Sequence, residues 1–345
     1  AHMKTHTERP WRGMEGSAGA AMGAQEFSVG VDIGGTNIKF GIVDAEGRII
    51  RQKKTPTDPR RGCEAILAGI VREVSALLSE AGLHARDVAS IGLGVPGTAL
   101  DGTVVYAPNL FWRDVPVAPV IAPVFGVPVA VAQDTRAAAW AEYLVGSARG
   151  LRGVAAVTLG TGIGCGLVID GRIFHGALNT AGEFGHQIVE IDGEHCNCGR
   201  TGCLEAHAGG LAIVREAKKR IPQLAGEREP SVADVYVLAQ HGNAEARKLT
   251  ERVCRYIGVG LVNLINLTSV EMICLSGGIS NAPAELLLDP LMAFVRSRAY
   301  EMAAKQVKIG RSTLGEDAPL IGAALLYREA GTRVAAERLA VAPAD

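Results

Sequence analysis

The chain has 345 residues, of which 48% are hydrophobic and 21% charged, and its formal net charge is −1 at pH 7. A chain of this length favours two hydrophobic cores over one large core. Because the net charge is close to zero, the sequence offers no electrostatic footprint for nucleic acid, and nucleic acid is not expected as a partner.

The sequence shows neither a membrane-spanning segment nor a secretory signal. A transmembrane helix needs about 18 or more consecutive apolar residues, and no such run occurs. We therefore expect a cytoplasmic protein with no membrane partner. Three of the seven cysteines lie together at 196–203. The others stand singly in apolar surroundings, as reduced core cysteines do: Cys63, Cys165, Cys254 and Cys274.

Residues 1–26 show no sustained periodicity, and we expect a disordered leader that begins with a cloning remnant, Ala1-His2. The pattern of the next part of the chain changes to strands separated by glycine-containing turns, which is typical of an antiparallel meander. These strands are predicted at 27–33, 38–44 and 49–54.

Beyond the meander, apolar residues recur at helical spacing and then in short buried runs. The sequence predicts a helix at 63–82, a strand at 88–95, a loop at 96–108, a strand at 128–132 and a helix at 134–146.

The second half repeats the scheme of the first. Strands are predicted at 154–159 and 165–169 around a glycine-rich turn, and Asp170-Gly171 is a hairpin signal. Two copies of the same motif, a pair of strands around a glycine-rich turn, indicate a duplicated architecture. The remaining predictions are helices at 205–220, 232–241, 243–267, 283–303 and 319–338, and strands at 271–276 and 305–309.

Three glycine turns suit phosphate or nucleoside binding, since glycine lets backbone N–H groups approach an anion closely. The first, Asp32-Ile33-Gly34-Gly35-Thr36, adds a hydroxyl donor and an acid that can hold Mg²⁺ directly or through water. Taken alone, a Gly-Gly-Thr hairpin is more often an ordinary turn. It is not a Walker loop, because no Lys-Ser/Thr pair follows the glycines. The other two turns are Gly160-Thr161-Gly162 and Gly277-Gly278.

Three thiols and an imidazole lie in one short segment: His186, Cys196, Cys198 and Cys203. Thiolates and a neutral imidazole suit tetrahedral Zn²⁺, so we predict a structural zinc site with these four ligands. The alternatives are a set of buried or redox-active cysteines, and His195 in place of His186 as the fourth ligand.

Together these motifs identify a family. Asp32-x-Gly-Gly-Thr36, Leu159-Gly-Thr-Gly162 and Ser276-Gly-Gly278 resemble the phosphate and adenosine loops of the actin/hexokinase/Hsp70 ATPase superfamily. Glu183-Phe-Gly-His186 with the cysteine segment resembles the ROK family of bacterial sugar kinases and repressors. The resemblance implies an α/β fold of two duplicated actin-like (ribonuclease H-like) domains, each a mixed sheet flanked by helices, with an interdomain cleft.

The resemblance also implies roles for individual residues. Asp134 would be the general base that takes a proton from a sugar hydroxyl, although as the first residue of a helix it could be a simple N-cap. The family usually has Asn where this chain has Gln133. The implied sugar contacts are Gly97, Asn109, Gln133, Asp134, Glu183, His186 and Glu205, and the implied ATP contacts are Asp32, Gly34, Gly35, Thr36, Lys39, Gly160, Thr161, Gly162, Gly277 and Gly278.

The function expected from the resemblance is ATP-dependent phosphorylation of a hexose, with Mg²⁺, by a homodimer. Glucose is the first choice of substrate, and N-acetylmannosamine, mannose and fructose are alternatives. A non-catalytic sugar-sensing regulator is the second class, but the first glycine turn begins too near the N-terminus to leave room for a DNA-binding domain. We expect a small domain of 27–133 plus 319–338 and a large domain of 134–318 that carries the zinc loop.

Overall fold

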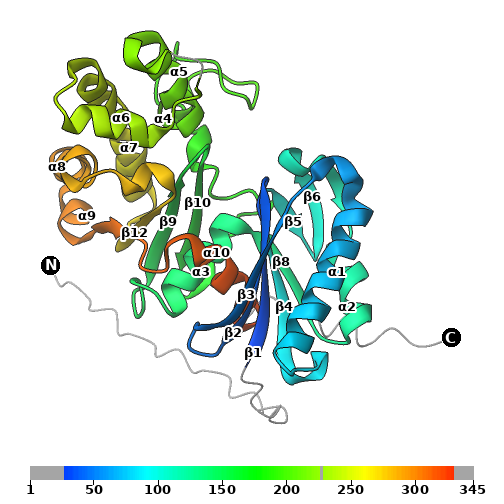
Figure 1. The fold of residues 1–345 in the computed structure, drawn as a ribbon. Coiled ribbons are helices and arrows are strands. Elements are labelled where there is room, and N and C mark those ends of the chain that lie inside the picture. Colours follow the sequence, from blue (N-terminus) through cyan, green and yellow to red (C-terminus); the bar gives the residue numbers. More distant parts are fainter. Residues whose placement is uncertain (1–26, 226–227, 330–345) are drawn as a thin grey trace, which may run out of the picture.

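The computed structural model describes residues 27–225 and 228–329, so the predicted leader lies outside the described residues. Two five-stranded sheets dominate the fold (Figure 1). Their strand orders are β3-β2-β1-β4-β8 and β11-β10-β9-β12-β13. In each sheet the central strand pairs antiparallel with the strand that follows it and parallel with a later strand. The two mixed sheets therefore share one topology, which confirms the predicted duplication.

The first sheet is flanked by helices and extended by a small third sheet. Its strands are β1 (Phe27–Ile33), β2 (Asn37–Asp44), β3 (Ile49–Pro56), β4 (Val88–Val95) and β8 (Val129–Gln133), and its helices are α1 (Gly62–Glu80) and α2 (Val117–Phe125). The third sheet has the order β5-β6-β7, with β5 (Thr98–Leu100), β6 (Thr103–Ala107) and β7 (Trp112–Val115).

Two sequence predictions fail in this part. The segment 96–108 is not a loop, because β5 and β6 pair around the turn at Asp101-Gly102. These strands are too short for alternation to reveal them. Helix α2 was not expected, because Pro123 lies inside it and proline argues against a helix in a sequence.

The second sheet carries most of the helices. Its strands are β9 (Gly153–Leu159), β10 (Ile163–Ile169), β11 (Arg172–Ile173), β12 (Met272–Ser276) and β13 (Lys308–Arg311). The helices are α4 (Leu204–Ala208), α5 (Gly210–Arg220), α6 (Val232–Gln240), α7 (Ala244–Thr268), α8 (Leu288–Arg298) and α9 (Glu301–Gln306).

Three boundaries differ from those predicted. The helix expected at 205–220 is broken at Gly209, whose ψ of 158° is extended. The helix expected at 283–303 is a 3-10 turn at 284–286 followed by α8 and α9, with an extended residue, Ala299, between them. Strand β13 starts at Lys308 rather than 305, because α9 continues to Gln306.

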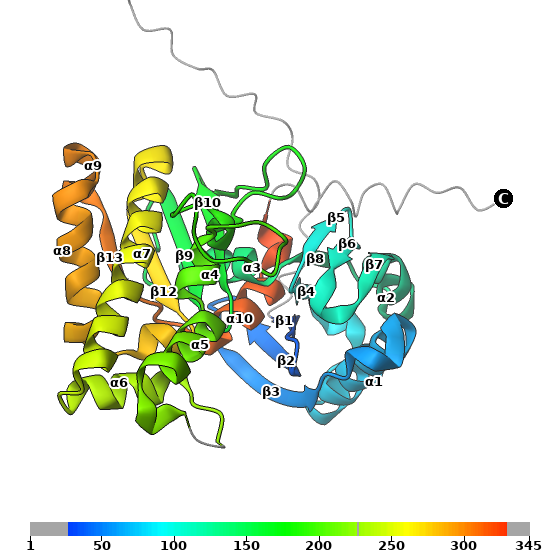
Figure 2. The ribbon, with the colours of Figure 1, turned by 90° about the horizontal axis from the view of Figure 1, so that it is seen from above.

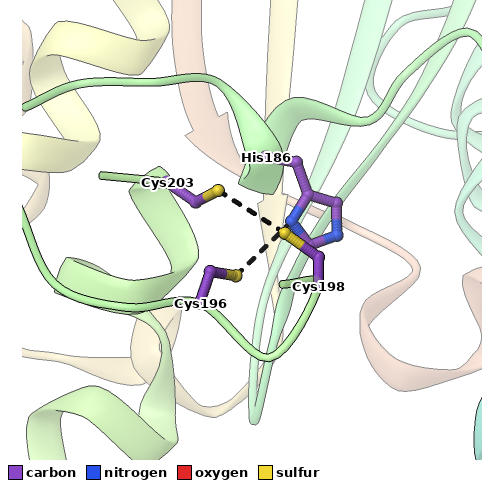
Figure 3. A group of neighbouring side chains, drawn as sticks. All are labelled: His186, Cys196, Cys198 and Cys203. Carbon is purple, nitrogen blue, oxygen red and sulfur yellow. Dashed lines mark hydrogen bonds between the residues drawn. The ribbon is translucent and has the colours of Figure 1, made fainter. Parts of the chain in front are cut away.

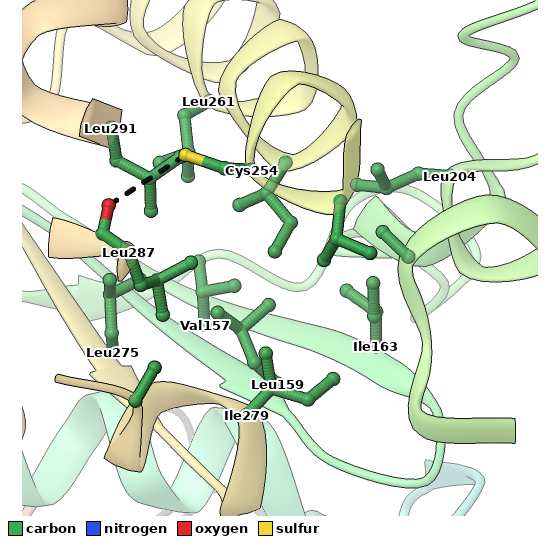
Figure 4. Packing of buried hydrophobic residues seen from close by; sticks show 14 of the residues in the cluster. Val157, Leu159, Ile163, Leu204, Cys254, Leu261, Leu275, Ile279, Leu287 and Leu291 are labelled. Carbon is green, nitrogen blue, oxygen red and sulfur yellow. Dashed lines mark hydrogen bonds between the residues drawn. The ribbon is translucent and has the colours of Figure 1, made fainter. Parts of the chain in front are cut away.

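The core of this second part lies between α7 and the sheet. Figure 4 shows Leu261 and Cys254 of α7 facing Val157 and Leu275 of the sheet, and all four side chains are buried. The Cys254 thiol donates a hydrogen bond to the carbonyl of Leu287. Cys165, Cys254 and Cys274 are buried free thiols, as expected, whereas Cys63 is only partly buried at the start of α1.

Two helices cross between the sheets: α3 (Asp134–Leu144) and α10 (Ala318–Ala324) (Figure 2). Helix α10 packs on β1 and β4, α3 packs on β9 and β10, and the two helices pack on each other. A Cβ atom on Gly322 would overlap the carbonyl oxygen of Ala137, so the two backbones touch directly. Of the helix predicted at 319–338, residues 330–338 lie outside the described residues.

No helix in the described part of the chain combines the length and the apolar character that a membrane crossing requires.

Candidate active site and metal centre

Asp134 is the first residue of α3 and follows β8 directly. It lies beside Gly94 near the end of β4: a Cβ atom on Gly94 would be 3.5 Å from the Asp134 Cα and 3.9 Å from Asp32 Oδ1. Asp32 of β1 and Asp134 at the start of α3 thus flank one glycine. Burial raises the pKa of Asp134 to about 7, and the charges of Asp32 and Glu183 add to this shift. A carboxyl group that titrates near neutral pH suits a general base.

Asp32 ends β1 and leads into the first glycine turn. Burial raises its pKa to about 6, which Lys39 opposes and Asp317 reinforces. The Lys39 Nζ donates to the Glu316 carbonyl oxygen at 2.7 Å and lies 3.5 Å from Asp317 Oδ1. Lys39 therefore ties β2 to the segment before α10. Asp317 was not expected at the site, and its only signal in the sequence is an acid just before an apolar helix.

The second and third glycine turns lie against each other. Gly277 has a φ of +86°, and a Cβ atom there would be 2.5 Å from the Leu159 carbonyl oxygen. Position 277 therefore requires glycine or a backbone shift. The third turn continues into a 3-10 helix at 278–281, ahead of the helix that the sequence predicts from 283. The second turn is also held from outside, because the Ile163 N–H donates to Glu205 Oε2 at 2.7 Å.

Replacing Gly162 with Val is expected to raise the KM for ATP about tenfold or more. A Cβ atom on Gly162 would lie 2.5 Å from Glu205 Oε2, so the larger side chain must push the turn away from its phosphate-binding position. Steady-state kinetics at saturating sugar measures the effect. Gly69→Val in α1 is the matched control, because a Cβ atom on Gly69 would meet only the end of the Arg72 side chain, at 3.8 Å. Unchanged nucleotide kinetics in Gly162→Val would contradict the phosphate-binding role of this turn.

Four side chains converge in the metal-site segment and point toward one another (Figure 3). His186 Nδ1 lies 3.7 Å from Cys196 Sγ, and Cys198 Sγ lies 3.7 Å from Cys203 Sγ. All four ligand atoms lie within 4.8 Å of one another. With Zn–S bonds of about 2.3 Å, the ligand atoms of a tetrahedral site are ~3.8 Å apart, so this donor set fits zinc.

The structure favours His186 over its rival as the fourth ligand. His195 instead pairs through its backbone with Thr201, and it is not a member of the four-residue cluster. The other nitrogen of His186, Nε2, lies 3.9 Å from Glu183 Oε2. One ring edge thus faces the cysteines and the other faces the Glu183 carboxylate, a candidate sugar contact. This arrangement fits the prediction that His186 has two roles.

The remaining candidate sugar contacts lie on the first sheet and its extension. The Gln133 side-chain oxygen is shielded from solvent and lacks a hydrogen-bond partner among the described residues. A buried acceptor of this kind needs a donor, and a sugar hydroxyl can supply one. Asn109 is exposed in a 3-10 turn at 108–110. Gly97 lets the chain after β4 pass close to the Tyr106 carbonyl oxygen, where a Cβ atom would overlap.

Arg136 has a structural role that sequence reasoning did not assign. It is 2% exposed, and its guanidinium donates to the carbonyl oxygens of Asn179 and Ala181 at 2.8 Å. The Asn179 side chain in turn donates to the Ala99 carbonyl oxygen on β5. Arg136 therefore holds the segment that leads to Glu183. The one feature of the sequence that could have indicated this role is a single cationic residue at the start of an alanine-rich helix.

The sequence is similar to those of known proteins along nearly its whole described length. The model of the ROK family matches residues 28–330. Glucokinase from Halalkalibacterium halodurans is 34% identical over 318 residues, which are 89% of this chain and 96% of that protein. The xylose repressor of Caldicellulosiruptor bescii is 28% identical, over 85% of this chain and 76% of the repressor.

Among solved structures, the ROK family glucokinase from Streptomyces griseus in complex with glucose and AMPPNP is similar to this chain. The two are 35% identical with a TM-score of 0.74, over 87% of this chain and 98% of that one. The sequence similarity and the shared architecture thus cover nearly the whole described part of the chain.

Proposed function

We propose that this chain, which belongs to the ROK family and is a sugar kinase of that family, phosphorylates glucose with ATP to give glucose 6-phosphate. The observation that carries the proposal is the position of Asp134, which lies beside Gly94 and close to Asp32, the acid that precedes the first glycine turn, and has a pKa raised to about 7. Glucose is favoured because the similar glucokinases share most of the chain's length.

In the proposed reaction Asp134 accepts the proton of the sugar 6-hydroxyl as that oxygen attacks the γ-phosphorus of ATP. The bond between the γ-phosphorus and the β,γ-bridging oxygen then breaks, and ADP leaves. The N–H groups of the first two glycine turns hold the phosphates. The Thr135 N–H donates to Asp134 Oδ1 at 2.7 Å, so the carboxylate is oriented by its own helix.

Asp32 is the proposed ligand of Mg²⁺, directly or through water. A carboxylate at the strand end beside Asp134 is a hard oxygen donor of the kind that Mg²⁺ prefers, so the residues fit the ion. When bound, Mg²⁺ neutralises charge on the ATP phosphates. The charge of Lys39, which lowers the pKa of Asp32, would favour the ionised form that binds the ion.

The sugar would be bound by Gln133, Asn109, Glu183 and His186, whose amide, carboxylate and imidazole groups can pair with vicinal hydroxyls. We propose that zinc holds His186 in its orientation. A site with four protein ligands leaves no position open for substrate, so its role is structural.

The pH dependence of kcat/KM for the sugar should follow the ionisation of the Asp134 carboxyl group. The base acts only when ionised, and its pKa is raised to about 7, so activity is full above that pH and falls as the pH drops through it. Below this value we expect about a tenfold loss per pH unit. Initial rates between about pH 5.5 and 8.5, with ADP detected directly, test this expectation. A flat profile across the range would contradict it.

A coupled assay of ADP release with glucose tests the proposed function. Turnover identifies a kinase, whereas sugar binding without turnover would favour a sensor, the class to which the similarity to xylose repressors points. Comparing kcat/KM for glucose, mannose, fructose and N-acetylmannosamine then decides the substrate. Glucose should have the highest value, and a higher value for another sugar would replace it as the proposed substrate.

We also propose that the chain forms a homodimer, as its family resemblance implies, in which each subunit pairs a domain of 27–133 plus 319–338 with a domain of 134–318. The packing of α10 on β1 and β4 supports assigning that helix to the first domain. Light scattering at micromolar concentration should give twice the chain mass of 36.0 kDa. A monomer mass under these conditions would contradict the dimer.

A further inference from the structure

Glu205 faces the second glycine turn and not only the expected sugar site. Its Oε2 accepts the Ile163 N–H at 2.7 Å, immediately after the Gly160–Gly162 turn. The same oxygen would lie 2.5 Å from a Cβ atom on Gly162. In the described part of the chain the other oxygen, Oε1, accepts no hydrogen bond, so it remains available to a sugar hydroxyl.

The chain on both sides of Glu205 links this turn to the metal centre. Cys203, a predicted zinc ligand, is the N-cap residue of α4, and Glu205 is the second residue of that helix. Five residues later, the Gly210 N–H at the start of α5 donates to the Gly160 carbonyl oxygen at 2.9 Å. A Cβ atom on Gly210 would approach that oxygen to 2.8 Å. The segment 203–210 thus contacts the turn at two points.

This segment is also firmly anchored. Leu204 is fully buried, and its N–H donates to the Gln187 carbonyl oxygen at 2.8 Å. A Cβ atom on Gly260 of α7 would lie 2.7 Å from a Leu204 methyl group and 3.0 Å from the Phe184 ring. Leu204 and Phe184 therefore pack at one place in the core. A displacement at Cys203 cannot be absorbed locally and would move Glu205 with it.

We infer that Glu205 positions the second glycine turn for the ATP phosphates, and that segment 203–210 makes nucleotide affinity depend on the metal centre. The inference rests on the proposed function, because it requires that this turn bind phosphate. A charge-assisted hydrogen bond to one N–H keeps the turn in a single conformation. Without it the turn must be ordered by the nucleotide, at a cost in affinity.

The role of Glu205 in nucleotide binding can be separated from any role in sugar binding. The measurement is the affinity for Mg-ADP in the absence of sugar, by titration calorimetry. Glu205→Ala should weaken this affinity about tenfold or more, the effect of losing a hydrogen bond to a charged group. Glu205→Gln keeps an acceptor oxygen at the same reach and should stay within about threefold of the wild type.

Glu183→Ala is the matched control. Glu183 is a carboxylate of the proposed sugar site that lies 3.9 Å from His186 Nε2, with no hydrogen bond to a glycine turn among the described residues. It should weaken sugar binding and leave Mg-ADP affinity unchanged. Glu205→Asp is the second test variant, because it keeps the charge but is one methylene too short to reach Ile163. Glu205→Asp should lose Mg-ADP affinity as Glu205→Ala does. If the Ala variant does not fold, the Asp variant alone tests the role of Glu205.

Normal Mg-ADP affinity in Glu205→Ala or Glu205→Asp would overturn the inference while leaving the proposed function intact. The same holds if Glu205→Gln loses as much affinity as Glu205→Ala, because charge rather than the hydrogen bond would then be responsible. A wild-type protein that binds no Mg-ADP and turns over no hexose would instead overturn the proposed function, and the inference with it.

Discussion

Replacing Asp134 with Asn is expected to lower kcat by several orders of magnitude while sugar affinity stays close to that of the wild type. Loss of a general base alone costs about 10²–10⁴-fold, and imperfect alignment of the attacking hydroxyl adds to this loss. The Asn side chain has the same shape and can still accept the Thr135 N–H that now binds Asp134 Oδ1. The sugar site should therefore survive, and rapid-quench or steady-state rates with glucose measure the loss.

The same variant should be more stable than the wild type at pH 8 in the absence of ligands. Burial raises the folded-state pKa of Asp134 to about 7, far above its value of about 3.9 in an unfolded chain. Ionising the buried group therefore costs stability, which is lost progressively as the pH rises from about 4 to 7, and the cost is complete above that. Asn does not ionise, so its melting temperature should be higher at pH 8 and nearly equal at pH 4.

Asp170→Asn is the matched control for this exchange. Asp170 is an exposed turn residue with a φ of 49°, which Asn tolerates, and it is paired with Arg152 away from the active site. Its kcat should equal that of the wild type. If Asp134→Asn retained more than about a tenth of wild-type kcat, Asp134 would not be the base and would be only the first residue of its helix.

Replacing Cys198 with Ala is expected to remove zinc and, with it, sugar affinity and thermal stability. Cys198 is the exposed cysteine of the cluster, so its loss leaves no large cavity and the effect should come from the missing ligand. Elemental analysis should find about one zinc per wild-type chain and a strongly reduced content in the variant. The melting temperature should fall by about 5 °C or more, because 1 kcal/mol corresponds to about 2–4 °C in domains of this size.

Nucleotide affinity separates two views of the metal centre. If the zinc loop carried only sugar contacts, its loss would affect the sugar site and spare the ATP site. The hydrogen bond from Ile163 to Glu205 changes this expectation, because Glu205 follows the ligand Cys203 by two residues. We now expect Cys198→Ala to weaken Mg-ADP binding as well as sugar binding. Cys63→Ala, at the partly buried start of α1, should change neither.

A metal-free protein with full activity, or a Cys198→Ala variant with a normal sugar KM, would show that zinc does not organise the site. Retained Mg-ADP affinity with lost sugar affinity would restore the simpler view, in which the metal acts on the sugar side only. The kinetics and the zinc content must be measured on the same preparations, because partial metal loss would mimic a partial effect.

Much of this molecule could be predicted from local patterns. Strands β1 and β4 lie at the residues predicted, because a buried strand shows itself as an apolar run bounded by turns. The four candidate metal ligands could be found in the sequence because they lie within 18 residues, counted from His186 to Cys203, and a short loop can bring them together with little help from the rest of the fold. The glycine turns were found for the same reason, since glycine marks close backbone approach wherever it occurs.

The tertiary structure alone decided which of these pieces meet. Asp32 and Asp134 are separated by about a hundred residues, and only the parallel pairing of β1, β4 and β8 brings both beside Gly94. The direction of the Glu205 side chain, toward the second glycine turn, depends on where α4 packs. Burial of Arg136 likewise depends on the segment that covers it. Contacts between distant segments leave no periodic trace in a sequence, because each partner is an ordinary residue in its own neighbourhood.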